Sequence, residues 1–387
     1  MGRETDWGSF GGAVSVFIDG EPVYERAAGL ANAAEGTLIS PDTCFRSASA
    51  SKQFVAASVL LLVEAGEVEL HAPIARYLPR CPTEWGEITA HQLLTHTGGL
   101  GHWSEVEGFD PVHPPSPEEI LERRARRPLV SAPGGEFAYS GVGYLLAARL
   151  VEHVADQPYA EFTTERVFAP LGMRSTRAGA RAPGPGPEAL GYRAGEPVDA
   201  TGISAIPGTG ELWTTVRDLN RYAIAFAADA LVSAFSRELM CAPHTAVPAA
   251  EGAFGETTGY GYGYWIGTID GLSAHYHPGD IMGYRSMYVS VLNARASIAI
   301  LSNRDETDAS AIAGRLWTEH CAGARSGGAA GRAGAESASE TWELWRQDDN
   351  GNRYLVSVHP DEASARDRMF VFESGTVHKQ NYWIQKL

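Results

Sequence analysis

Apolar residues alternate with polar ones, or run continuously, near both ends of the first 320 residues, and these patterns predict β-strands. Residues 12–19 and 22–27 flank Asp19-Gly20, a dipeptide that favours a tight hairpin turn. Later segments repeat the strand pattern before one more helical segment near 308–320. They are residues 259–268, 272–278, 283–292 and 295–302.

The middle of the chain has the 3.6-residue period of helices instead. Its predicted helices are 116–127, 140–155, 157–169 and 215–228, and three prolines in 175–190 exclude a regular element there. The order of these elements, with strands first, helices next and strands last, predicts an α+β fold of three α/β/α layers. We expect an antiparallel sheet flanked by helices in a catalytic domain, residues 1–321, with a helical insertion at about 67–255.

The character of the chain changes after residue 321. Residues 322–338 are almost entirely alanine, glycine, serine and arginine, which predicts a flexible linker. Residues 339–387 then predict a small ββαβ domain: a hairpin around Asn350-Gly351, a short helix from Asp361 and a last strand near 380–384. Its role cannot be inferred from the pattern.

Composition excludes several classes of function. The net charge of −16 argues against nucleic acid or an anionic membrane surface as partner. The four cysteines are far apart, which is typical of thiols in a reducing compartment. The N-terminal residues carry no apolar signal segment, and no run approaches membrane-spanning length. We therefore expect a cytoplasmic protein, provided that the chain has not been trimmed.

Lysine is almost absent, and its one early occurrence follows a serine. Three of the 31 basic residues are lysines, and Lys52 is the only one before residue 379. Ser49 and Lys52 are three residues apart at the start of an apolar helical run that ends at Gly66, so they can meet on one helix face. Unlike arginine, lysine can lose its proton and act as a base for a serine nucleophile. The alternative is an N-cap serine followed by a solvated lysine.

Three other segments hold further candidates. Tyr139 stands at a loop-to-helix junction, and His277 lies near the end of a predicted strand. Each residue alone is also typical of a packed structural side chain, and we interpret His96 as a structural loop histidine. His275 and His277 share one strand face, but no third ligand is evident. We therefore expect neither a metal site nor a cofactor.

Together these segments resemble the penicillin-recognising serine hydrolases: class C β-lactamases, DD-peptidases, D-aminopeptidases and β-lactamase-like esterases and transacylases. The resemblance covers about residues 10–320. It is carried by Ser49-Ala-Ser-Lys52, Tyr139-Ser-Gly141 and His277-Pro-Gly279, and by Leu93–Leu100, Pro170–Met173 and Leu301–Arg304.

The resemblance implies a role for each matching residue. Ser49 would be the nucleophile, and Lys52 and Tyr139 would share the work of general base. The backbone N–H groups of Ser49 and Asp280 would form the oxyanion hole. His277 would help to order the Tyr139 hydroxyl and the far side of the substrate. Substrate-binding positions would be Gly141, Gly279 and Arg285.

Gly141 departs from the family pattern, which has an asparagine that bonds the lysine and the substrate's acylamino group. Its absence weakens the case for a β-lactamase or a DD-peptidase, and we expect Gly141→Asn to favour amides over esters. The function predicted is a serine acyl-enzyme hydrolase or acyltransferase acting on an ester or amide of a small molecule or short peptide, with a D-residue and a biosynthetic setting both compatible. A non-catalytic binding protein on the same fold and a true DD-peptidase or β-lactamase are the alternatives. Oligomeric state is open.

Overall fold

We analysed a computed structural model of the chain, which describes residues 10–179, 186–248, 254–322, 342–347, 353–359 and 381–386. Its residues cluster into two compact units, 1–327 and 328–387. Among the described residues, no helix is long and apolar enough to cross a membrane.

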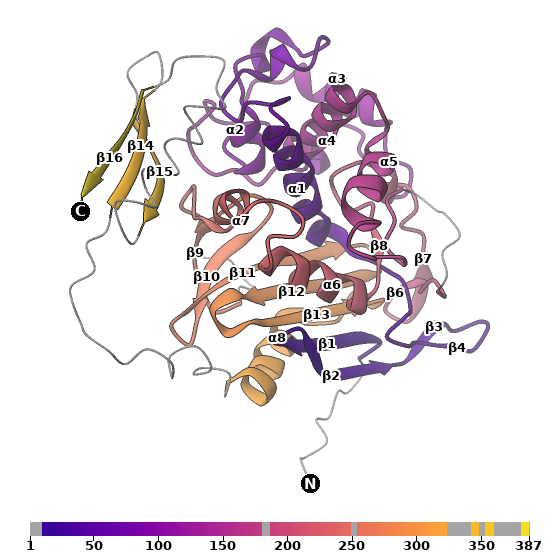
Figure 1. Ribbon diagram of the computed structural model, residues 1–387. Coiled ribbons are helices and arrows are strands. Elements are labelled where there is room, and N and C mark those ends of the chain that lie inside the picture. The colour runs from indigo at the N-terminus through magenta and orange to yellow at the C-terminus, as the bar shows by residue number, and fades with distance from the viewer. Residues whose placement is uncertain are drawn as a thin grey trace, which may run out of the picture. The chain divides into compact units, whose positions relative to one another are not determined.

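The first unit is built on a seven-stranded antiparallel sheet of order β2-β1-β13-β12-β11-β10-β9 (Figure 1). The first strand of this unit therefore pairs with its last strand, β1 against β13. This confirms the predicted antiparallel sheet shared by the first and last thirds of this unit. The strands are β1 (Gly12–Ile18), β2 (Glu21–Ala28), β9 (Glu256–Tyr260), β10 (Trp265–Ile269), β11 (Leu272–Ile281), β12 (Tyr284–Val291) and β13 (Ala296–Ser302).

Both faces of this sheet are covered, and β13 shows why its sequence is apolar throughout. All seven of its residues are buried. Ala299 and Leu301 belong to one core cluster, whereas Ile298 and Ile300 belong to a second cluster on the other face. Successive side chains of a strand point to opposite faces, so a strand between two helical layers has no solvent face to mark with polar residues.

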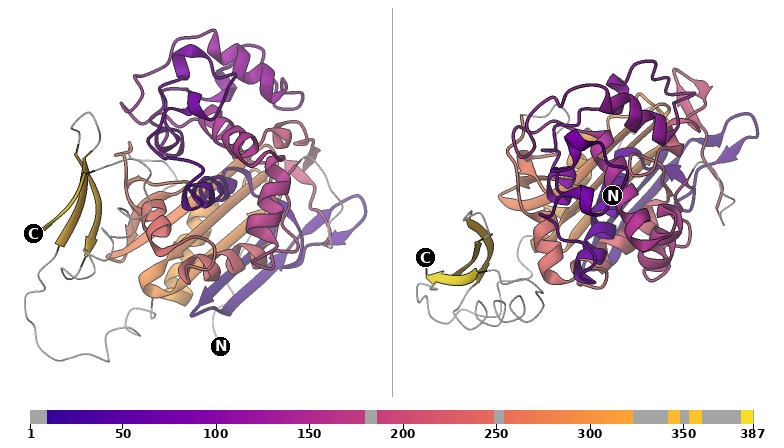
Figure 2. Two further views of the ribbon diagram at one scale, coloured as in Figure 1. Left: turned by 45° about the horizontal axis from the view of Figure 1, so that its top comes forward. Right: turned by 90° about the horizontal axis from the view of Figure 1, so that it is seen from above.

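The helices form the outer two layers (Figure 2). The smaller core includes residues of α8 (Ala309–Leu316), and the larger core includes residues of most of the other helices. These are α1 (Lys52–Glu64), α2 (Ala90–Leu94), α3 (Pro117–Ala125), α4 (Gly141–Ala155), α5 (Tyr159–Thr163), α6 (Val216–Ala227) and α7 (Ala234–Cys241). The α+β class and the helices at 116–127, 140–155 and 215–228 are confirmed.

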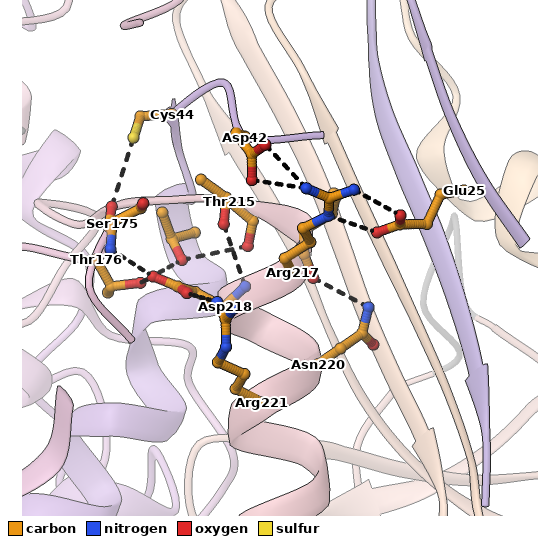
Figure 3. A network of polar contacts seen from close by, with 12 residues as sticks. Glu25, Asp42, Cys44, Ser175, Thr176, Thr215, Arg217, Asp218, Asn220 and Arg221 are labelled. Carbon is orange, nitrogen blue, oxygen red and sulfur yellow. Dashed lines mark hydrogen bonds and ion pairs between the residues drawn. The ribbon is translucent and has the colours of Figure 1, made fainter. Parts of the chain in front are cut away.

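Ion pairs and hydrogen bonds of α6 hold this helix against other segments of the unit. Arg217 of α6 donates to both carboxylate oxygens of Glu25 in β2, at 3.0 and 2.9 Å, and also to Asp42 (Figure 3). The neighbouring Asp218 is buried and accepts the Ser175 N–H at 2.8 Å and the Thr176 hydroxyl at 2.9 Å. Consecutive residues of one helix thus hold two different segments.

Several predicted boundaries were wrong. The single strand expected at 259–268 is two strands, because Gly263 has φ of +77° and the chain turns between β9 and β10. The helix expected at 157–169 is α5 followed by a π-helical turn, Thr164–Phe168. No pattern indicated α7 or the short strands. These are β3 (Leu30–Asn32), β4 (Thr37–Leu38), β5 (Phe45–Arg46), β6 (Gly191–Arg193), β7 (Glu196–Val198) and β8 (Trp213–Thr214).

The second unit contains a three-stranded antiparallel sheet of order β15-β14-β16. Its strands are β14 (Trp342–Gln347), β15 (Arg353–His359) and β16 (Asn381–Lys386). The predicted linker, the Asn350-Gly351 turn and the short helix from Asp361 lie outside the described residues.

Candidate active site

Ser49 lies on a sharply turned segment between β5 and α1. Ser47 donates its N–H to the carbonyl of Leu212, and Ala48 has φ of +49°, a left-handed conformation that non-glycine residues rarely adopt. A 3-10 turn, Ala48–Ser51, then leads into α1. Because this conformation costs free energy and recurs at functional sites, its place directly before Ser49 supports a functional role for the serine.

Lys52 reaches back to Ser49 across this turn. Its Nζ lies 3.2 Å from Ser49 Oγ, and the lysine side chain is buried whereas Ser49 is partly exposed. In the part of the chain that the structure describes, Lys52 forms no ion pair with a carboxylate. The rings of Tyr139 and Tyr144 surround the amine instead, with centroids at 5.1 and 5.4 Å. This lysine is therefore not a solvated surface residue, contrary to the alternative interpretation of the motif.

The charge of Lys52 reaches three histidines. Burial and this charge lower the pKa of His277 to about 3 and that of His102 to about 4. The same two causes lower the pKa of His96 well below its usual range. All three imidazoles are therefore neutral at neutral pH.

Gly279 brings the end of β11 against the nucleophile segment. A Cβ built at this position would overlap the Ser47 carbonyl and the Ser286 hydroxyl, and would come within 3.0 Å of the Ala48 side chain. Only glycine allows this approach. Because side chains alternate along β11, Asp280 points away and is exposed, while its backbone lies one residue from the contact. The use of its N–H group in an oxyanion hole stays a prediction.

Tyr139 and the start of α4 are held by His96. The Ser140 N–H donates to His96 Nδ1 at 2.9 Å, and the Ser140 hydroxyl accepts from the Gly143 N–H at 2.9 Å, capping the helix. The imidazole also packs against the Tyr139 ring, 4.3 Å between centroids. These contacts agree with the structural role expected for His96.

His277 has other partners than the sequence indicates. Its Nε2 lies 3.0 Å from the Tyr260 hydroxyl, and its Nδ1 lies 2.6 Å from the Pro278 carbonyl. The carbonyl can only accept, so Nδ1 carries the proton and Nε2 accepts from Tyr260. Both nitrogens are thus occupied, and neither bonds the Tyr139 hydroxyl as predicted. Tyr260, buried and 17 residues away in sequence, carried no signal that could have identified it.

The space beside Gly141 is already filled by another side chain. A Cβ built on Gly141 would overlap the indole ring of Trp103, so the glycine accommodates this ring at the start of α4. The expected effect of Gly141→Asn assumed room for the amide, which exists only if Trp103 moves. Nothing in the sequence couples these two residues, because they meet only through the packing of a loop onto a helix.

Arg285 is already engaged within the fold. Its guanidinium pairs with Asp280 at 2.7 Å and with Asp305 at 3.1 Å, and it donates to the carbonyls of Ile281 and Tyr284. Two carboxylates thus share its charge, and its role at a substrate-binding position stays a prediction. Among the described residues, no group of three histidine, cysteine, aspartate or glutamate side chains is arranged to hold a metal ion.

Comparison with known proteins identifies the family of the chain. The family model described as Beta-lactamase matches residues 4–320, so the chain belongs to the β-lactamase family of serine hydrolases. Esterase EstB of Burkholderia gladioli is 39% identical over 181 residues, which are 42% of this chain and 46% of the esterase. The chain thus matches about half the length of that relative.

Two solved structures share the fold. The D-amino acid amidase of Ochrobactrum anthropi SV3, complexed with L-phenylalanine amide, superimposes with a TM-score of 0.68 and 25% identity over 79% of this chain and 91% of the amidase. The octameric penicillin-binding protein homologue from Pyrococcus abyssi gives a TM-score of 0.69 and 26% identity over 80% of this chain and 74% of that protein.

Proposed function

We propose that the chain cleaves an ester or amide of a small molecule or short peptide through an acyl-enzyme on Ser49. One observation carries the proposal: the Lys52 amine, buried and without a described carboxylate partner, lies 3.2 Å from the Ser49 hydroxyl. A serine becomes a nucleophile when an adjacent base removes its proton, and an amine at this distance can do so. EstB and the D-amino acid amidase, by their names, act on an ester and an amide.

The residues suggest a complete cycle. Lys52 takes the proton of Ser49 as Oγ attacks the carbonyl carbon, and the N–H groups of Ser49 and Asp280 stabilise the oxyanion. The bond from carbon to the leaving oxygen or nitrogen then breaks, and that atom receives a proton through Tyr139 and Lys52. Water, or the hydroxyl or amine of an acceptor, then attacks the acyl carbon and gives a proton to Lys52. The bond from this carbon to Ser49 Oγ breaks, and Oγ takes the proton back. Hydrolysis and acyl transfer differ only in this last nucleophile.

Intact-protein mass spectrometry tests the proposal. The full chain is incubated with p-nitrophenyl acetate and, separately, with D-phenylalanine amide, and the modified peptide is sequenced. We expect one acyl group on Ser49 and none in Ser49→Ala. Ser51→Ala is the matched control, because Ser51 lies in the same turn with a buried hydroxyl that has no partner among the described residues. An adduct that persists in Ser49→Ala would refute the assignment of the nucleophile.

A further inference from the structure

A continuous row of rings extends from the candidate site. Trp265 of β10 lies 6.3 Å from Tyr139, with their planes 15° apart, and Tyr139 lies 6.2 Å from His102, with planes 24° apart. The row continues from His102 to Trp103 at 4.3 Å and from Trp103 to Phe109 at 4.5 Å. We call these five side chains the aromatic row.

The row is built from three separate parts of the chain, and every member is partly exposed. Three of the four spacings lie in the range of favourable aromatic pairs, and the rings of His102 and Trp103 are closer still, so the row is a packed unit. Exposed aromatic surface beside a reactive group is unusual for a soluble protein and marks a place where a ligand can be buried. The row joins the catalytic candidates at Tyr139, whose ring centroid is 5.1 Å from Lys52 Nζ.

Gly141 gives the row its shape. The overlap of a Cβ at this position with the Trp103 indole means that any larger residue would displace the ring from its place between His102 and Phe109. Gly141 has no left-handed backbone angle that would itself demand glycine. Glycine is also a poor helix former compared with alanine. The residue is therefore explained by the ring that it admits.

We propose that the aromatic row, through Trp103 in particular, binds a ring-bearing, uncharged group of the substrate, and that Gly141 contributes to specificity by leaving room for the Trp103 ring. The inference rests on the proposed function, since it concerns the substrate of Ser49. The low pKa of His102, about 4 through burial and the charge of Lys52, keeps that member of the row neutral at neutral pH.

Two pairs of esters test the inference on the full chain. Methyl acetate against methyl phenylacetate adds a ring to the acyl group, and methyl acetate against benzyl acetate adds one to the alcohol. We expect wild type to prefer the ring-bearing member of at least one pair. Trp103→Ala should lower kcat/KM for that ester by about tenfold and change the ring-free ester by less than about threefold. Trp103→Phe keeps a ring and should retain most of the preference.

Glycine variants supply the matched control. Gly141→Ala should displace the indole and reproduce the loss seen in Trp103→Ala, and it should cost nothing further when Trp103 is already alanine. Gly143→Ala, in the same helix, would place its Cβ 3.4 Å from Ser140 Oγ and 3.5 Å from the Leu93 carbonyl, ordinary contact distances, and should match wild type.

Two results distinguish a failure of this inference from a failure of the proposed function. Equal losses on ring-bearing and ring-free esters, or no ring preference in either pair, would overturn the role of the row while acylation of Ser49 still stands. Absence of any Ser49 adduct in the wild-type mass measurement would instead refute the proposed function on which the inference rests.

Discussion

Replacing Lys52 by arginine separates the charge of this side chain from its ability to give up a proton. Lys52→Arg keeps a cation beside Ser49 but cannot act as a base. We expect a loss of kcat/KM of about 10³-fold or more, close to that of Ser49→Ala, because a nucleophile and its base act as a unit. Hydrolysis of p-nitrophenyl acetate measures both variants. Substantial activity in Lys52→Arg would show that Lys52 is not the base.

Tyr139 can be tested in the same assay. Tyr139→Phe removes the hydroxyl but keeps the ring that packs against His96 and lies near Lys52. Without a positioned proton carrier, acyl transfer should slow by about 10²–10⁴-fold, while circular dichroism and the melting temperature stay those of wild type. Wild-type kinetics in Tyr139→Phe would reduce this residue to a packing role.

At the scale of elements, two adjacent residues of α6, Asp218 and Arg217, make polar contacts that contribute unequally to the free energy of unfolding. Asp218 is buried and accepts from Ser175 and Thr176, so Asp218→Ala leaves the partly buried Ser175 N–H without its acceptor and should cost about 1–3 kcal/mol of unfolding free energy. Arg217 is 38% exposed, and Arg217→Met should cost less than about 1 kcal/mol despite its two carboxylate partners. Urea titrations of the two variants compare them directly. Equal losses would contradict this ranking.

Helices and strands were predicted correctly where their sequence signal lies within the element itself. The helices at 116–127 and 140–155 begin at capping serines, Ser116 and Ser140, and the central strands β12 and β13 are buried, mostly apolar runs. Such signals lie within one element and survive packing. The short strands β5 and β8 carry no such signal, because they form only where residues 45–46 meet residues 213–214.

For the whole molecule, buried histidines make stability depend on pH. Burial lowers the pKa of His275 from 6.5 to about 3, so below pH 6.5 the unfolded chain takes up a proton that the folded chain refuses. The contribution of this residue is therefore full above that pH and is lost as pH falls, by about 2 kcal/mol at about pH 5. His91 and His277 shift in the same direction, also to about 3.

Substitution of one histidine measures its own contribution to the pH dependence of the unfolding free energy. His275→Gln should lose less unfolding free energy than wild type between about pH 7.5 and about pH 5, whatever its stability at the higher pH. His113, with 84% of its side chain exposed, provides the control, and His113→Gln should follow wild type. An unchanged pH dependence in His275→Gln would show that the folded protein accommodates the charged imidazole.

The two compact units lead to a last prediction. All four catalytic candidates lie before residue 281, and the cluster that contains them ends at residue 327. A chain of residues 1–322 should therefore fold and still acylate Ser49 with p-nitrophenyl acetate, as measured by intact mass. An insoluble product, or one that no longer acylates, would show that residues 323–387 complete the catalytic fold.

The sequence by itself determined the parts of this protein whose signals are local. The spacing of Ser49 and Lys52, the order of strands and helices, and the motif segments at Tyr139 and His277 depend on residues close together in the chain. Helix geometry alone places residues three apart on one face, so the 3.2 Å contact between Lys52 and Ser49 could be expected in advance.

Tertiary structure decided everything that depends on distant segments meeting. Tyr260 takes the hydrogen bond of His277, Asp280 and Asp305 neutralise Arg285, and Trp103 fills the space above Gly141. A missing side chain in the sequence suggests a vacancy, but interiors are close-packed, and whichever segment folds nearest fills the space. Which ring takes that place is a property of the packing, and the specificity that we propose follows from it.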